Sequence, residues 1–80
     1  MDKSIFTTEH KRLQELLRQI RLGAGLRQED LAQLLGKDQW FVSRYESGER
    51  RLDLIELRSI CQAVGISLGE LVKRFEESLP

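Results

Sequence analysis

One short segment of the chain, residues 38–47, carries side chains suited to reading the bases of a nucleic acid. Arg44 can form a forked pair with guanine, and Gln39 can pair with adenine through its amide. Trp40 can press its ring on a thymine methyl group or on sugar edges, and the alternative is that it packs against a neighbouring helix or a protein partner. At about 100° per helical residue, with Val42 pointing inward, the outward arc holds the candidate base-contacting residues. These residues are Gln39, Trp40, Ser43, Arg44 and Ser47.

A second group of residues, on either side of this segment, can contact phosphate. The free backbone N–H groups at the start of a helix near Gln28 attract anions, and Gln28 itself points outward there. Arg50 and Arg51 follow the base-reading segment, and the alternative for these two is a solvated charge cluster beside Glu49. The candidate phosphate-contacting residues are Arg27, Gln28, Lys37, Arg50 and Arg51.

Five helices are predicted to position these residues, and strand signals are absent. The first helix begins after Thr7 or Thr8 and ends at Gly25. Apolar residues recur along it at steps of three and four, which predicts an inner face of Leu13, Leu16, Leu17, Ile20 and Ala24. His10 is expected on the surface of this helix.

The second and third helices, about residues 28–35 and 38–47, are predicted to form a helix-turn-helix, a motif that places its second helix in the DNA major groove. Gly36 and Gly48 end the two helices, and Asp38 caps the start of the later one. The residues expected at the helix crossing or facing the rest of the bundle are Leu31, Ala32, Leu35, Val42 and Tyr45.

The fourth and fifth helices each begin with a capping signal. Asp53 stands three residues before Glu56, and Ser67 stands three before Glu70, which is the fuller capping-box signature. Gly65 ends the fourth helix. An apolar stripe continues along the fifth helix almost to the C-terminus, longer than one small core requires. We therefore expect a homodimer interface that uses Leu68, Val72, Phe75 and Leu79.

Glu46 falls on the inward arc of the segment 38–47. An unpaired carboxylate would be costly there, so it needs a cationic partner. Arg21, late in the first helix, is the candidate, and the pair Arg21 and Glu46 is predicted to be structural.

Length and composition fit a single helical domain over residues 1–80. The one cysteine excludes an intramolecular disulfide, and no signal peptide or membrane-length apolar run is present, so we expect a reduced, cytoplasmic setting without membrane contact. Lys plus Arg and Asp plus Glu both number 13. Residues 1–51 carry ten basic residues against eight acidic ones, and residues 52–80 carry three against five, which permits one face to meet phosphate.

The chain lacks the residue patterns of an enzyme. His10 has no cysteine, carboxylate pair or serine at catalytic spacing, and neither a glycine-rich phosphate loop nor a metal-ligand cluster is present. Cys61 lies on the apolar stripe of the fourth helix, where a buried thiol is expected. We expect no catalysis, no cofactor and no metal.

The spacing of these residues closely resembles the Cro and phage-repressor type of helix-turn-helix, also called the xenobiotic-response-element (XRE) family of bacterial and phage regulators. The resemblance covers roughly residues 13–75. It rests on Arg18, Arg21, Gly25, Leu26, Gln28, Leu31, Ala32, Leu35, Gly36, Val42, Ser43, Glu46, Gly48 and Arg50, and on the later segment Gly65-x-Ser67-x-x-Glu70-Leu71.

This resemblance implies an all-α, five-helix, lambda-repressor-like domain that acts as a sequence-specific DNA-binding transcriptional regulator of bacterial or phage origin, associated with the nucleoid. It implies a dimer on a palindromic operator, with phosphate contacts from Gln28 and Arg50 and an internal ion pair like that of Arg21 with Glu46. The bases would be met by Gln39, Trp40, Ser43 and Arg44. The chain departs from the family pattern at Arg27, where Ser or Thr usually caps the helix, and at Trp40, where a small polar residue is commoner.

The alternative function is a protein-interaction module of helix-turn-helix shape, such as an antitoxin or a regulatory partner. Neutral net charge, an outward Trp40 and the apolar run of the fifth helix favour it. Salt distinguishes the two, because DNA affinity falls steeply with added salt and an apolar protein interface responds little.

Overall fold

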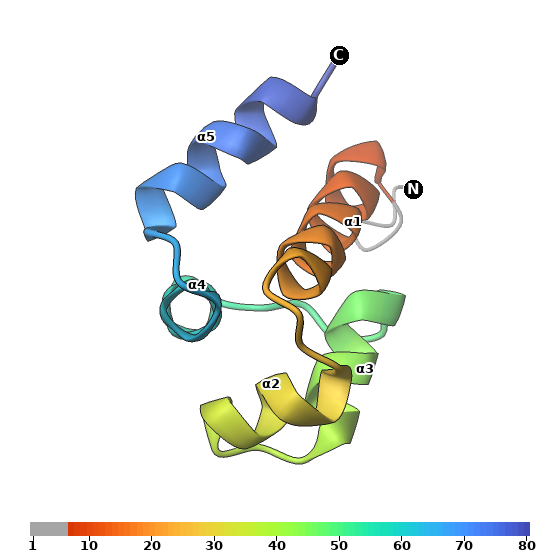
Figure 1. The fold of residues 1–80 in the computed structure, drawn as a ribbon. Helices are drawn as coiled ribbons and strands as arrows, with labels where there is room; N and C mark the ends of the chain where they lie inside the picture. Colours follow the sequence, from red (N-terminus) through yellow and green to blue (C-terminus); the bar gives the residue numbers. More distant parts are fainter. Residues whose placement is uncertain (1–6) are drawn as a thin grey trace.

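Local capping interactions set the helix boundaries in the computed structural model, which describes residues 7–80. The helices are α1 (Thr8–Gly23), α2 (Gln28–Leu35), α3 (Gln39–Ser47), α4 (Leu54–Val64) and α5 (Leu68–Ser78), as Figure 1 shows. No strand is present among these residues. The predicted all-α, five-helix architecture is therefore confirmed.

The N-terminal caps follow the predicted residues. Thr7, Asp38, Asp53 and Ser67 each accept a hydrogen bond from the backbone N–H three residues further on. The reciprocal half of the capping box forms at Asp53, whose own N–H donates to the Glu56 carboxylate at 2.9 Å. At Ser67, where the fuller box was predicted, the Glu70 carboxylate instead accepts from Arg74 at 2.8 Å. A cation one turn further along the helix thus competes for the carboxylate that a capping box would use.

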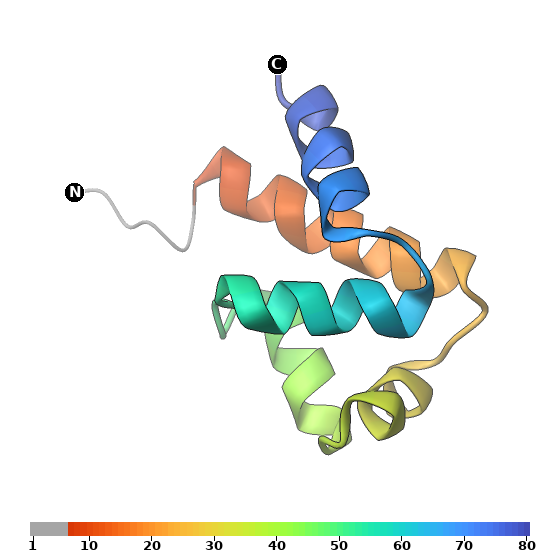
Figure 2. The ribbon, with the colours of Figure 1, turned by 90° about the vertical axis from the view of Figure 1, so that its left-hand side faces the viewer.

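The helices are arranged in three levels, with α1 and α4 in the middle (Figure 2). α2 and α3 pack together at one end, and α5 lies at the other. Between them, α1 contacts α3 and α5, while α4 contacts α2 and α5. Every helix contributes to the buried core of Leu17, Ile20, Leu31, Ala32, Val42, Tyr45, Ile60, Cys61 and Leu71. Cys61 is fully buried as expected, and burial raises the pKa of its thiol.

Three expectations for α1 were wrong. The helix ends at Gly23 rather than Gly25, because Ala24 caps it and Gly25 turns the chain with a φ of 76°. Ala24 is therefore exposed beyond the last turn instead of lying on the inner face. His10 is buried, with 8% of its surface exposed, because it lies on the same helix face as Leu17, seven residues later. Burial and the positive charge of Arg51 lower the pKa of His10.

Within residues 7–80, no helix combines the length and the apolar character that crossing a membrane requires.

Candidate nucleic-acid interface

α3 turns apolar side chains inward and polar ones outward. Val42 and Tyr45 are buried, and the Glu46 side chain is only 5% exposed. Trp40, in the first turn, is 65% exposed. Asp38, the N-cap of α3, is exposed. The structure exposes Gln39, Trp40, Arg44 and Ser47 on the outward side and leaves Ser43 half-buried at its edge.

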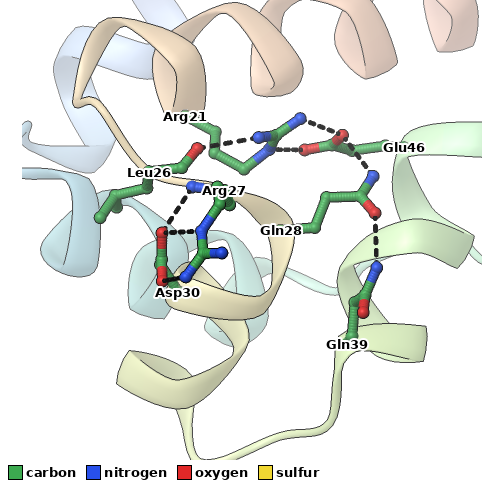
Figure 3. A network of polar contacts seen from close by, with 7 residues as sticks. All are labelled: Arg21, Leu26, Arg27, Gln28, Asp30, Gln39 and Glu46. Atoms are coloured by element: carbon green, nitrogen blue, oxygen red, sulfur yellow. Dashed lines mark hydrogen bonds and ion pairs between the residues drawn. The ribbon is translucent and has the colours of Figure 1, made fainter.

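A buried ion pair holds the inward side of α3 to α1 (Figure 3). Arg21 Nε donates to Glu46 Oε2 at 2.7 Å, and Arg21 Nη2 donates to Oε1 at 3.0 Å. The remaining terminal nitrogen, Nη1, donates to the Leu26 carbonyl at 2.8 Å. The hydrogen bonds that Arg21 donates to Glu46 raise the pKa of Arg21 above its ordinary value. The pair that the sequence predicted is thus present, and it joins α1, α3 and the segment between α1 and α2.

Gln28 extends this pair to the outward surface. Its Nε2 donates to Glu46 Oε1 at 3.1 Å, and its Oε1 accepts from Gln39 Nε2 at 3.4 Å (Figure 3). Gln39, the first residue of α3, is therefore tied through one side chain to a core ion pair. The sequence indicates separate roles for Gln28 and Gln39 and does not reveal this link, because the link depends on how the starts of α2 and α3 meet in space.

A second residue of α1, Gln14, holds the end of α3. Gln14 Nε2 donates to the backbone carbonyl of Glu46 at 3.2 Å. Gly48 follows α3 with a φ of 89°, and a Cβ atom there would lie 2.8 Å from the Gln14 amide nitrogen. Sequence reasoning did not single out Gln14. The available signal is its separation of seven residues from Arg21, which places both on one face of α1.

Arg27, a candidate phosphate contact, is held by the first turn of α2. Its guanidinium donates to the Asp30 carboxylate at 3.0 Å, and its backbone N–H donates to the same group at 2.9 Å. The Glu29 carboxylate lies 3.6 Å from Arg27 Nη2. These contacts lower the pKa of Asp30. Asp30 thus satisfies a backbone N–H at the start of α2, where the chain lacks the usual Ser or Thr cap.

Arg50 joins the segment after α3 to the start of α4. Its guanidinium makes a two-pronged pair with the Glu56 carboxylate at 2.8 and 3.0 Å and lies 4.9 Å from the centre of the Phe41 ring. The pair raises the pKa of Arg50 and lowers that of Glu56. The carboxylate that holds Arg50 is therefore Glu56, not the neighbouring Glu49. Lys37 Nζ lies 5.4 Å from the centre of the same ring.

A helix-turn-helix that buries one side of its second helix and presents polar side chains on the other has the form that DNA-binding domains use. The model of the helix-turn-helix family HTH_3 matches residues 17–71, and the chain belongs to this family. It is a DNA-binding transcriptional regulator of the XRE type, in a family of regulators rather than enzymes. No group of three or more His, Cys, Asp or Glu that could hold a metal ion occurs within residues 7–80.

Solved structures share this fold over nearly the whole chain. An XRE-family-like protein from Pseudomonas syringae pv. tomato is 38% identical to this chain and superposes with a TM-score of 0.85. The match covers 96% of this chain and 94% of the Pseudomonas chain. A variant of the restriction-modification controller protein C.Esp1396I is 25% identical, with coverage of 89% and 90% and a TM-score of 0.81. The clp gene regulator ClgR from Corynebacterium glutamicum is 24% identical, with coverage of 90% and 77% and a TM-score of 0.79. Among curated proteins, none matches the chain.

Proposed function

We propose that this regulator recognises a specific palindromic operator as a homodimer, with α3 in the major groove. One observation carries the proposal. The outward side of α3 presents polar side chains and Trp40, and its first residue, Gln39, is tied through Gln28 to the ion pair of Arg21 with Glu46. A helix about 10–12 Å across fits a major groove about 12 Å wide. The hydrogen bond to Gln28 orients the Gln39 side chain beside the start of α2 before DNA arrives.

The chemistry of the outward side chains supports direct base contacts. Gln39 uses one of its two amide N–H groups on Gln28, which leaves one donor and its carbonyl oxygen for an adenine edge. Arg44 is exposed and suits guanine, while the exposed ring of Trp40 suits a thymine methyl group. Ser43 and Ser47 complete the proposed base-contacting set.

The proposed phosphate contacts differ in how firmly each side chain is already held. Gln28 lies at the start of α2, where backbone N–H groups attract anions. Arg27 and Arg50 each bind a carboxylate of their own protein, so a phosphate would have to compete with Asp30 or Glu56. We therefore assign Arg50 chiefly to positioning α4 against the end of α3. Lys37 and Arg51 complete the proposed phosphate set.

The proposed homodimer uses the part of α5 that the core leaves uncovered. Leu71 is buried against the core and Leu68 packs at its margin. Val72 is 48% exposed, and Phe75 and Leu79 are half-buried. The proposed interface therefore centres on Val72, Phe75 and Leu79, with Leu68 at its edge. Sedimentation that shows only monomer, with and without DNA, would exclude the homodimer.

Selection from a randomised duplex DNA pool tests the function. Purified protein is incubated with the pool at moderate salt, and the bound fraction is sequenced. Enrichment of an inverted repeat with half-sites about 10 bp apart is expected for a dimeric regulator. The Arg44→Ala variant should lose the preference at one base position while it keeps the same fold. Absence of any enriched sequence would instead favour the protein-interaction module, and Trp40→Ser would then weaken a protein complex.

A further inference from the structure

A polar hollow of about 230 Å³ opens beside α3, on the side that faces α1 and α2. It is lined by Arg18 from α1, by Gln28 from α2, and by Ser43, Glu46 and Ser47 from α3. The sequence alone indicates no individual role for Arg18. The hollow therefore adds a basic side chain from α1 to a surface otherwise built by α2 and α3.

The charge of the hollow comes from Arg18. Arg21 balances the Glu46 carboxylate, and Arg27 and Arg50 are paired with carboxylates elsewhere. Arg18 is exposed, and within the described residues 7–80 it has neither an ion pair nor a hydrogen bond. One positive charge is therefore available to a ligand in this hollow.

In the proposed binding mode, the hollow lies beside the path of a DNA backbone. When a helix fills the major groove, the two phosphate backbones run along its flanks. Ser43 and Ser47 belong both to the hollow and to the proposed base-contacting set, so the hollow borders the outward side of α3. A phosphate at that border would lie within reach of three donors. These are the Arg18 guanidinium, the Ser43 hydroxyl and the Gln28 N–H that Glu46 does not use.

We propose that this hollow seats one backbone phosphate of the bound DNA, with Arg18 as its charged contact and Gln28 and Ser43 as hydrogen-bond donors. The inference rests on the proposed DNA-binding function. Because every nucleotide carries the same phosphate, the seat contributes affinity and register without reading a base. It accordingly acts on operator and unrelated DNA alike.

The test compares Arg18→Gln with a matched control, Arg12→Gln. Both remove one exposed positive charge from α1, and Arg12 does not line the hollow. The affinity of the full chain for the selected operator and for an unrelated duplex is measured across a range of salt. Loss of one phosphate contact reduces the slope of log K against log salt by about 0.9, which corresponds to roughly eightfold weaker binding at 0.1 M salt. Arg18→Gln should show this change on both duplexes, while Arg12→Gln and Arg18→Lys should keep the wild-type slope.

A second measurement locates the phosphate. A neutral methylphosphonate is placed at each backbone position of the operator in turn. At one position in each half-site it should weaken binding of the wild type but not of Arg18→Gln, because that variant has already lost the contact. Equal salt slopes for Arg18→Gln and Arg12→Gln, with steep salt dependence in the wild type, would exclude the seat and leave the proposed function intact. A wild type whose DNA affinity does not depend on salt would exclude both.

Discussion

Removal of the Glu46 carboxylate should be among the most damaging single substitutions in this protein. In Glu46→Ala, the Arg21 side chain, 7% exposed, would keep only the Leu26 carbonyl as a partner. Two hydrogen bonds from Arg21 and one from Gln28 would lose their acceptor. Breaking a buried ion pair by removing one partner costs about 3–5 kcal/mol. Each kcal/mol shifts the Tm of a domain this size by about 4–8 °C, so we expect a Tm lower by about 12–40 °C.

Circular-dichroism melting at neutral pH measures this effect directly. Glu49→Ala is the matched control, because Glu49 is exposed and its backbone N–H donates to the Arg44 carbonyl and the Ser47 hydroxyl, both of which the substitution leaves in place. Its Tm should stay within a few degrees of the wild type. Replacing both partners, as in Arg21→Met with Glu46→Leu, should recover much of the loss, since no buried charge then remains unpaired. A Glu46→Ala protein that melts within 3 °C of Glu49→Ala, a span of about 1 kcal/mol or less, would refute the reasoning.

Three further outcomes are expected. Gly48→Ala should lower the Tm, because residue 48 has a φ of 89° and the added Cβ would lie 2.8 Å from the Gln14 amide nitrogen. The loss of Tm should be smaller in a Gln14→Ala background. Equal losses in both backgrounds would show that Gln14 does not restrict this position. Arg50 lowers the pKa of Glu56, so the pair contributes stability above about pH 4.3 that is lost as the pH falls through that lowered pKa. Urea unfolding of Glu56→Gln should therefore depend less on pH between 5 and 2, and an unchanged dependence would contradict this assignment. Cys61 is fully buried with a raised pKa, so a thiol reagent should modify the native protein far more slowly than the urea-unfolded chain, and similar rates would argue against its burial.

Helix boundaries could be predicted from the sequence because the interactions that set them are local. A cap needs only a side chain and an N–H three residues away, as at Asp38 and Asp53. The glycines after α2 and α3 adopt the left-handed conformation for an equally local reason. The pair of Arg21 with Glu46 was also accessible, because an inward carboxylate on a helix requires a cation.

Several contacts that the sequence did not reveal join elements whose relative positions only the fold sets. Arg50 and Glu56 are six residues apart across a loop, a spacing without a fixed geometry. Gln28 meets Gln39 across the turn of the helix-turn-helix, and Gln14 meets α3 from α1. His10 shows a second limit, because it is a polar residue that lies on the buried face of α1. A prediction based on the spacing of apolar residues assigns such a residue to the surface.

The hydrogen bonds that run from Arg21 through Glu46 and Gln28 to Gln39 bear on any effort to redirect this protein to a new operator. Exchanging only the outward residues of α3 would replace Gln39 and leave its partner on α2 unmatched. A transplanted recognition helix would then start without the contact that orients its first residue. In the proposed binding mode, positions 28 and 39 would have to be exchanged together, and operator preference would be a property of two helices rather than one.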